Sequence, residues 1–110
     1  MERVLIILSN FPAAYDIAGL LRELLEQHLV ACGNILPAVQ SPYRWQGAIE
    51  SAMESTLVLK TSAGRYAEVQ AALLAAHPYA VPEILAMPVV DGLPAYLTWV
   101  QEETRKDVDV

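Results

Sequence analysis

A few side chains of the types that bind metal ions or move protons could carry chemistry in this sequence: His28, Cys32, Glu50, Glu54, His77 and Glu83. No two of them have the spacing of a recognised metal-binding motif, such as two cysteines separated by two residues. His77 stands directly before Pro78, at the predicted end of a helix, where an imidazole more often caps the last carbonyls than binds a metal. Because imidazole suits copper, zinc and nickel, we predict at most weak binding of a divalent metal, with His77 as its best ligand.

Nucleophilic catalysis has little support. The sequence contains no G-x-S-x-G segment and no Walker-type glycine loop. Nothing pairs Cys32 with His28, and a free cysteine is most often buried and inert. A small phosphohydrolase of the acylphosphatase type would need an arginine beside backbone N–H groups. The segment after the first predicted strand, residues 9–12, contains neither arginine nor glycine, so we expect no enzyme and keep the phosphohydrolase as a less favoured alternative.

The overall composition excludes several classes of protein. With 110 residues, 55% of them hydrophobic and 18% charged, the chain is expected to fold as a single domain over residues 1–110. Thirteen acidic residues against seven basic ones give a net charge of −6, which disfavours a nucleic-acid partner. The first apolar run, residues 4–8, is too short for a signal peptide, and no stretch is long enough for a membrane helix. We therefore predict a cytoplasmic protein with no membrane partner.

The first half of the chain reads as strand, helix and hairpin. Residues 4–8 are continuously apolar, which predicts a strand buried on both faces and broken by residues 9–12. A helix is predicted from Ala13 to about Ala31, with His28 on its apolar stripe. Residues 32–46 predict a long bent strand interrupted near Pro37, Pro42 or both. After the turn at Gln46-Gly47, residues 48–61 form its partner.

The second half predicts a helix, a strand and a further helix. Residues 62–76 carry an apolar stripe at helical spacing, and Ser62 is a plausible N-cap. Residues 84–87 predict the fourth strand, and Pro94 fits the first turn of a helix that continues over residues 95–103. The order is that of an α+β, ferredoxin-like βαββαβ fold, with two helices on one face of an antiparallel sheet and an additional C-terminal helix. The second sheet face then stays uncovered although it is apolar, which predicts association of sheet faces.

Several residues in the predicted hairpin could belong to a binding surface. Tyr43 and Trp45 lie close to breaks in the predicted elements, and Tyr and Trp are enriched at interfaces, although ordinary sheet packing would also explain them. Glu50 and Glu54 are separated by an even number of residues, so a strand presents both on one face. They could bind a cation, pair with Lys60 on the same face, or be solvated.

Five segments together resemble one protein family. They are residues 29–37 (LVACGNILP), residues 41–50 (SPYRWQGAIE), Glu54 with residues 59–61 (LKT), residues 77–84 (HPYAVPEI), and the tail that contains Gly92, Tyr96, Leu97 and Trp99. In this order and spacing the chain resembles CutA, the divalent-cation tolerance proteins, over residues 4–100. The resemblance implies a ferredoxin-like fold, a homotrimer similar in architecture to the PII signalling proteins, and a role in tolerance to divalent cations. Copper binding is attributed to some members, and no catalytic reaction is established for the family.

The resemblance also implies where a ligand would bind, since pockets favour interfaces and the motif residues could line a cleft between subunits. These residues are Tyr43, Trp45, Glu50, Glu54, Lys60, His77, Tyr79 and Glu83. No cofactor is required, and a copper or other divalent ion is the expected candidate ligand. Ala80 replaces a glutamate of the family pattern, and Ser9 stands where some members have a cysteine, whose thiolate would select copper(I). Both departures argue against a tight copper site, and a ligand-free structural or signalling trimer is the alternative.

Overall fold

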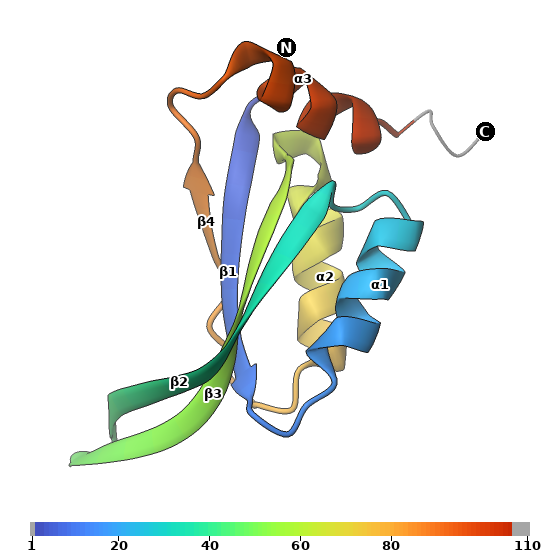
Figure 1. The fold of residues 1–110 in the computed structure, drawn as a ribbon. Helices are drawn as coiled ribbons and strands as arrows, with labels where there is room; N and C mark the ends of the chain where they lie inside the picture. The colour runs from blue at the N-terminus through green and yellow to red at the C-terminus, as the bar shows by residue number, and fades with distance from the viewer. Residues whose placement is uncertain (1, 107–110) are drawn as a thin grey trace.

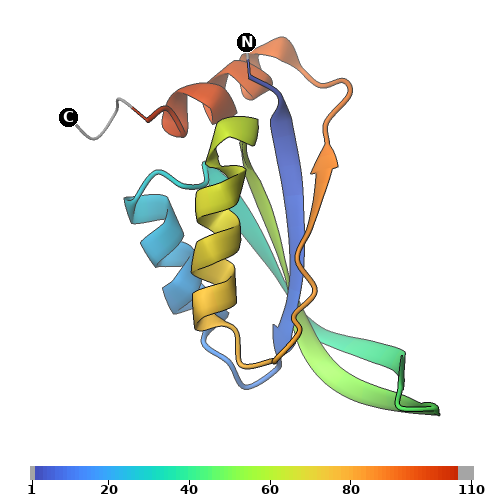
Figure 2. The same cartoon turned by 180° about the vertical axis from the view of Figure 1, so that it is seen from behind.

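The structure is a computed structural model that describes residues 2–106 (Figure 1). Along the chain it contains β1 (Val4–Pro12), α1 (Ile17–Glu26), β2 (Cys32–Trp45), β3 (Ala48–Ser62), the short 3-10 turn η1 (Ala63–Arg65), α2 (Tyr66–Ala76), β4 (Leu85–Pro88) and α3 (Pro94–Glu103). The strands form one antiparallel sheet in the order β2-β3-β1-β4. Helices α1 and α2 cover one face, and α3 lies across one end (Figures 1 and 2). The predicted α+β fold is therefore confirmed.

The hydrophobic core lies between the sheet and the two helices that cover it. Ile7 and Phe11 of β1 and Leu57 and Leu59 of β3 are fully buried there. They face apolar side chains of α1 and α2, namely Ile17, Leu20, Leu24, Val69 and Leu73. The strand period of two explains why alternate positions of β3 enter this core, as the sequence predicts.

The opposite sheet face is apolar and, apart from the end where Cys32 and Ser62 contact Tyr96 and Thr104, has no helical cover. We call it the open face. Strand pairing places several apolar residues on the open face, in the pairs Ile6↔Met87, Leu8↔Leu85, Leu8↔Val58 and Thr56↔Leu36. Leu85 and Leu36 remain about half exposed, at 54% and 46%. Within the part of the chain that the structure describes, the predicted uncovered face is thus confirmed.

Two predicted boundaries in the first half of the chain are wrong. β1 does not break after Leu8 but continues to Pro12, because Ser9 and Phe11 carry on the inward alternation and pair with β3. α1 begins at Ile17 rather than Ala13, because the Asp16 carboxylate caps it by accepting from the Gly19 N–H at 3.1 Å.

The end of α1 and the start of α2 also differ from the sequence prediction. α1 ends at Glu26, so His28 is not on its stripe; His28 has a positive φ of 58°, and its Nδ1 lies 3.0 Å from the Glu103 carbonyl oxygen. Ser62 does not cap α2, because its hydroxyl pairs with Thr104 at 2.6 Å. The helix instead begins at Tyr66, after the 3-10 turn.

The β2–β3 hairpin extends well beyond the rest of the sheet, as Figures 1 and 2 show. We call its outer part, residues 39–54, the arm. One irregularity, between Leu36 and Val39, interrupts the pairing next to Pro37, whereas Pro42 stays in register with Ser51. Pro42 is tolerated because β2 is an edge strand. At the tip, Gln46 and Gly47 both have positive φ, as a tight two-residue hairpin turn requires.

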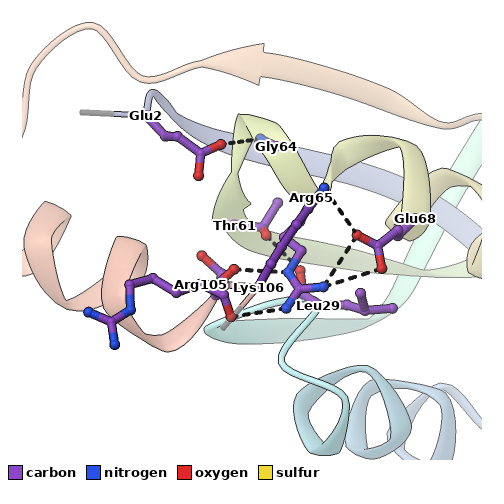
Figure 3. A network of polar contacts seen from close by, with 9 residues as sticks. Glu2, Leu29, Thr61, Gly64, Arg65, Glu68, Arg105 and Lys106 are labelled. Carbon is purple, nitrogen blue, oxygen red and sulfur yellow. Dashed lines mark hydrogen bonds and ion pairs between the residues drawn. The ribbon is translucent and has the colours of Figure 1, made fainter. Parts of the chain in front are cut away.

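A buried arginine attaches α3 to the start of α2 (Figure 3). The Arg65 side chain donates to the carbonyl oxygens of Thr104 at 2.9 Å and Arg105 at 3.1 Å, and both oxygens of Glu68 lie 3.2 Å from Nη1. Arg65 is only 5% exposed. Since guanidinium groups are almost never buried without partners, this network is what allows the burial. No helix within residues 2–106 has the length and apolar character needed to cross a membrane.

Candidate functional site

A cavity of about 750 Å³ lies where the arm leaves the sheet. β2 supplies Ser41, Pro42, Tyr43 and Trp45, and β3 supplies Ala52 and Glu54. The remaining lining comes from Asn10 of β1 and from the loop that follows α2, with Pro78, Tyr79, Ala80, Val81 and Glu83. Alternation along the strands puts Glu54 and Asn10 on the same side as the open face. The cavity therefore adjoins the surface that no helix covers.

Hydrogen bonds join the arm, β1 and this loop around the cavity. The Tyr79 hydroxyl donates to Glu54 Oε2 at 2.8 Å, and the Asn10 amide donates to Glu83 Oε1 at 3.2 Å. Thr56 Oγ1 in turn donates to Asn10 Oδ1 at 2.5 Å. These bonds orient the carboxylates of Glu54 and Glu83, so the cavity presents two acidic groups in fixed positions.

Glu54 is the most buried residue of the cavity lining, and it pairs with Tyr79. Glu54 is only 8% exposed, and Tyr79 is 36% exposed. Burial and the hydrogen bond to Glu54 raise the pKa of Tyr79 to about 12. The phenol therefore stays protonated at neutral pH and continues to donate to the carboxylate.

His77 lies behind the cavity wall rather than in it. Its Nε2 is 2.8 Å from the Asn10 carbonyl oxygen, and its Nδ1 accepts from the Tyr79 N–H at 3.3 Å. The ring stacks on Phe11 with 4.0 Å between centroids. Burial lowers the pKa of His77, so the neutral imidazole, protonated at Nε2, fits both contacts.

This arrangement bears on the predicted metal site. Both His77 nitrogens have partners, so a metal could reach this ring only by replacing one of the two hydrogen bonds. Residues 2–106 contain no group of three or more His, Cys, Asp or Glu side chains able to hold a metal ion. The described side chains of the single chain thus do not fit a preformed metal centre, and His77 stays a prediction for weak binding.

The structure brings together most, but not all, of the residues that the sequence singled out. Five of them line the cavity: Tyr43, Trp45, Glu54, Tyr79 and Glu83. Glu50 lies beside it, where the Tyr43 hydroxyl donates to Glu50 Oε1 at 3.4 Å. Lys60 is directed elsewhere and donates to Asn34 Oδ1 of β2.

Sequence reasoning missed Asn10, which connects β1 to the loop residue Glu83. Its only signal is an amide side chain just after the apolar run, within residues 9–12, which the sequence predicts to be a break. Ser9, also expected in the break, is buried and donates to the Glu83 carbonyl oxygen at 2.7 Å. Cys32 is outside the cavity lining, with its sulfur 3.3 Å from the Tyr96 hydroxyl.

Comparison with known proteins gives consistent matches. The family model of the CutA1 divalent ion tolerance protein matches residues 5–103. A divalent-cation tolerance protein CutA of Thermus thermophilus is 40% identical over 103 residues, which cover 94% of this chain and 97% of that protein. The mouse protein CutA is 36% identical over 96 residues, or 87% of this chain but 52% of its own length, so the chain spans about half of that relative.

A solved structure from Archaeoglobus fulgidus, described as a periplasmic divalent cation tolerance protein CutA, has a TM-score of 0.87 to this chain. It is 34% identical, and the match covers 93% of this chain and 99% of that one. The fold and the sequence therefore match the same group of proteins.

Proposed function

We propose a function from one premise: this chain belongs to the CutA1 family of divalent ion tolerance proteins. The chain would act in tolerance to divalent cations as a binding protein without a catalytic step. The observation that supports this most directly is the cavity beside the arm, where aromatic side chains surround two oriented carboxylates. Family names that describe tolerance rather than a reaction agree with it.

The second part of the proposal is that the protein works as a homotrimer. The open face supports association, because Leu36, Leu85 and Met87 are exposed on it beside Ile6 and Leu8. Exposed apolar patches of this kind mark contact surfaces in soluble proteins. The number three comes from the resemblance to CutA proteins. Because the cavity adjoins the open face, a neighbouring subunit would close it and make it an intersubunit cleft.

Mass measurement in solution at low micromolar concentration tests the assembly. We expect a species of three times the 12.1 kDa chain mass and no stable folded monomer. A predominant, well-folded 12.1 kDa species would contradict both the argument from the open face and the argument from the family.

The third part concerns the ligand, which we propose is a small molecule or a weakly held divalent ion such as copper. Imidazole and carboxylates are suitable copper ligands, and neighbouring subunits could add oxygen ligands to His77. Calorimetry with copper(II) and zinc should detect weak binding that His77→Gln reduces further. Gln retains a group able to donate to the Asn10 carbonyl, so circular dichroism should show an unchanged fold. Equal affinity in both proteins would remove His77 from the site.

The proposed location is the cytoplasm, with neither nucleic acid nor a membrane as partner. The sequence contains a single cysteine and so forms no internal disulfide, which agrees with this location. The excess of acidic residues supports the absence of a nucleic-acid partner. Cell fractionation with an antibody to the full chain would test the location.

A further inference from the structure

We infer that the cavity beside the arm takes an organic ammonium ion, a cation whose nitrogen carries alkyl groups. This inference rests on the proposed function, because it assumes that the cavity is a ligand site. The expected occupant of this cavity is then a larger cation with an apolar surface, in place of a bare metal ion.

The first argument is the charge of the lining. Within residues 2–106 the cavity is lined by the carboxylates Glu54 and Glu83 and by no lysine, arginine or histidine. Their hydrogen-bond donors, Tyr79 and Asn10, are both neutral groups. Glu54 is 8% exposed, and a carboxylate this buried is costly without a positive charge nearby. A ligand that brings this charge would be stabilised by both carboxylates.

The second argument is the aromatic content of the same cavity. The side chains of Tyr43, Trp45 and Tyr79 belong to its lining, together with Pro42 and Val81. Aromatic faces attract cations, and alkylated ammonium ions above all, because these are weakly hydrated and also gain from apolar contact. Trp45 and Tyr43 are 52% and 42% exposed in the single chain, so their rings are accessible from the cavity that a neighbouring subunit would close into a cleft.

The third argument is size and coordination. A volume of about 750 Å³ lies in the range of sites for small organic molecules and far exceeds that of a metal ion. A transition metal would need a cluster of nitrogen, sulfur or oxygen ligands, and residues 2–106 hold no such group of His, Cys, Asp and Glu side chains. The cavity therefore fits a cation recognised by rings and by two separate carboxylates.

A charged probe and its neutral analogue test the inference on the full-length protein in its native assembly. The probes are choline and 3,3-dimethylbutan-1-ol, in which carbon replaces the nitrogen. The chain has two tryptophans, and Trp99 lies outside the cavity lining. The Trp99→Phe protein thus reports on Trp45 alone. We expect choline to change the Trp45 fluorescence saturably, and the neutral analogue to bind at least about tenfold more weakly.

Variants then locate the effect. Glu54→Gln removes the charge while keeping an oxygen that can accept from Tyr79, and we expect choline affinity in it to fall about tenfold. Trp45→Leu should weaken the binding of choline by a similar factor, as measured by calorimetry. Glu23→Gln, on the exposed side of α1, removes the same charge outside the cavity and should leave the affinity unchanged.

Several results would overturn the inference. They are the absence of a saturable response to choline, equal binding of the neutral analogue, or equal losses in Glu54→Gln and Glu23→Gln. If choline does not bind, but copper or another small ligand binds with an affinity that depends on the cavity residues, only this inference is wrong. If no ligand responds to these variants, the proposed function fails as well.

Discussion

Replacing Tyr79 by Phe removes one hydroxyl from the Glu54–Tyr79 pair at the cavity and leaves the ring in place. The Glu54 carboxylate, 8% exposed, then loses its 2.8 Å hydrogen bond from the phenol. A hydrogen bond to a charged group contributes about 1.5–3 kcal/mol to stability. Tyr79 is 36% exposed, so water can partly replace the lost donor, and we expect a destabilisation of about 1–2 kcal/mol.

Thermal melting at a fixed protein concentration measures this loss, because the proposed assembly would make the melting temperature depend on concentration. In a domain near 100 residues, 1 kcal/mol corresponds to roughly 4–8 °C, so a drop of several degrees is expected. Tyr66→Phe is the matched control, since the Tyr66 hydroxyl donates at 2.7 Å to Gln70 on the exposed side of α2. If Tyr79→Phe melts no lower than Tyr66→Phe, the Glu54–Tyr79 pair does not stabilise the fold and the reasoning is refuted.

The pH dependence adds an independent check. The pKa of Tyr79 is raised from 10.0 to about 12 in the folded protein. A raised pKa contributes stability that is fully present below the unfolded value and is lost as the pH rises through the folded one. The melting difference between the native chain and Tyr79→Phe should therefore shrink between about pH 10 and pH 12. A difference that stays constant over this window would show that Tyr79 titrates normally.

Three further predictions concern the arm, the metal and α3. Trp45→Ala should lower the melting temperature and promote dissociation. Trp45 is 52% exposed in the single chain, so the loss of stability approaches the ~3–5 kcal/mol of a buried aromatic only if the proposed assembly covers its ring. An unchanged melting temperature and an unchanged mass would show that Trp45 stays exposed. Copper(II) binding at His77 should weaken as the pH falls, because protons compete with the metal for imidazole, and calorimetry at two pH values would check this. Arg65→Met should cost about 3 kcal/mol in denaturant unfolding, because it leaves the carbonyls of Thr104 and Arg105 without their donor. Arg22→Met, which removes an exposed ion pair, should have no measurable effect.

Local spacing accounts for the parts of the fold that the sequence predicted. The alternation in residues 56–61 predicts which side chains of β3 enter the core, and Leu57 and Leu59 are fully buried as expected. The uncovered apolar face also followed from counting helices against apolar strand faces. These features depend on neighbouring residues and on the strand period of two or the helix period of 3.6, so they can be recognised in the sequence without knowledge of the tertiary structure.

Element boundaries were less predictable because tertiary contacts decide them. Residues 9–12 contain serine, asparagine and proline, which is typical of a break, yet β3 pairs with them up to Pro12. The burial of Phe11 between the sheet and the helices outweighs the local preference. α1 similarly begins where Asp16 can cap it rather than where the apolar pattern starts.

The sequence by itself determined the family resemblance, the fold class, the aromatic character of the arm and the even spacing that puts Glu50 and Glu54 on one face. Only the tertiary structure decided that Tyr79 bonds to Glu54, that Asn10 bonds to Glu83, and that both nitrogens of His77 are occupied. These partners are separated by up to 73 residues, apart from the local contact between His77 and Tyr79. Spacing along a chain fixes the direction of a side chain within its own element. Which element faces it depends on the strand order β2-β3-β1-β4 and on the path of the loop after α2, and these follow from packing of the whole chain.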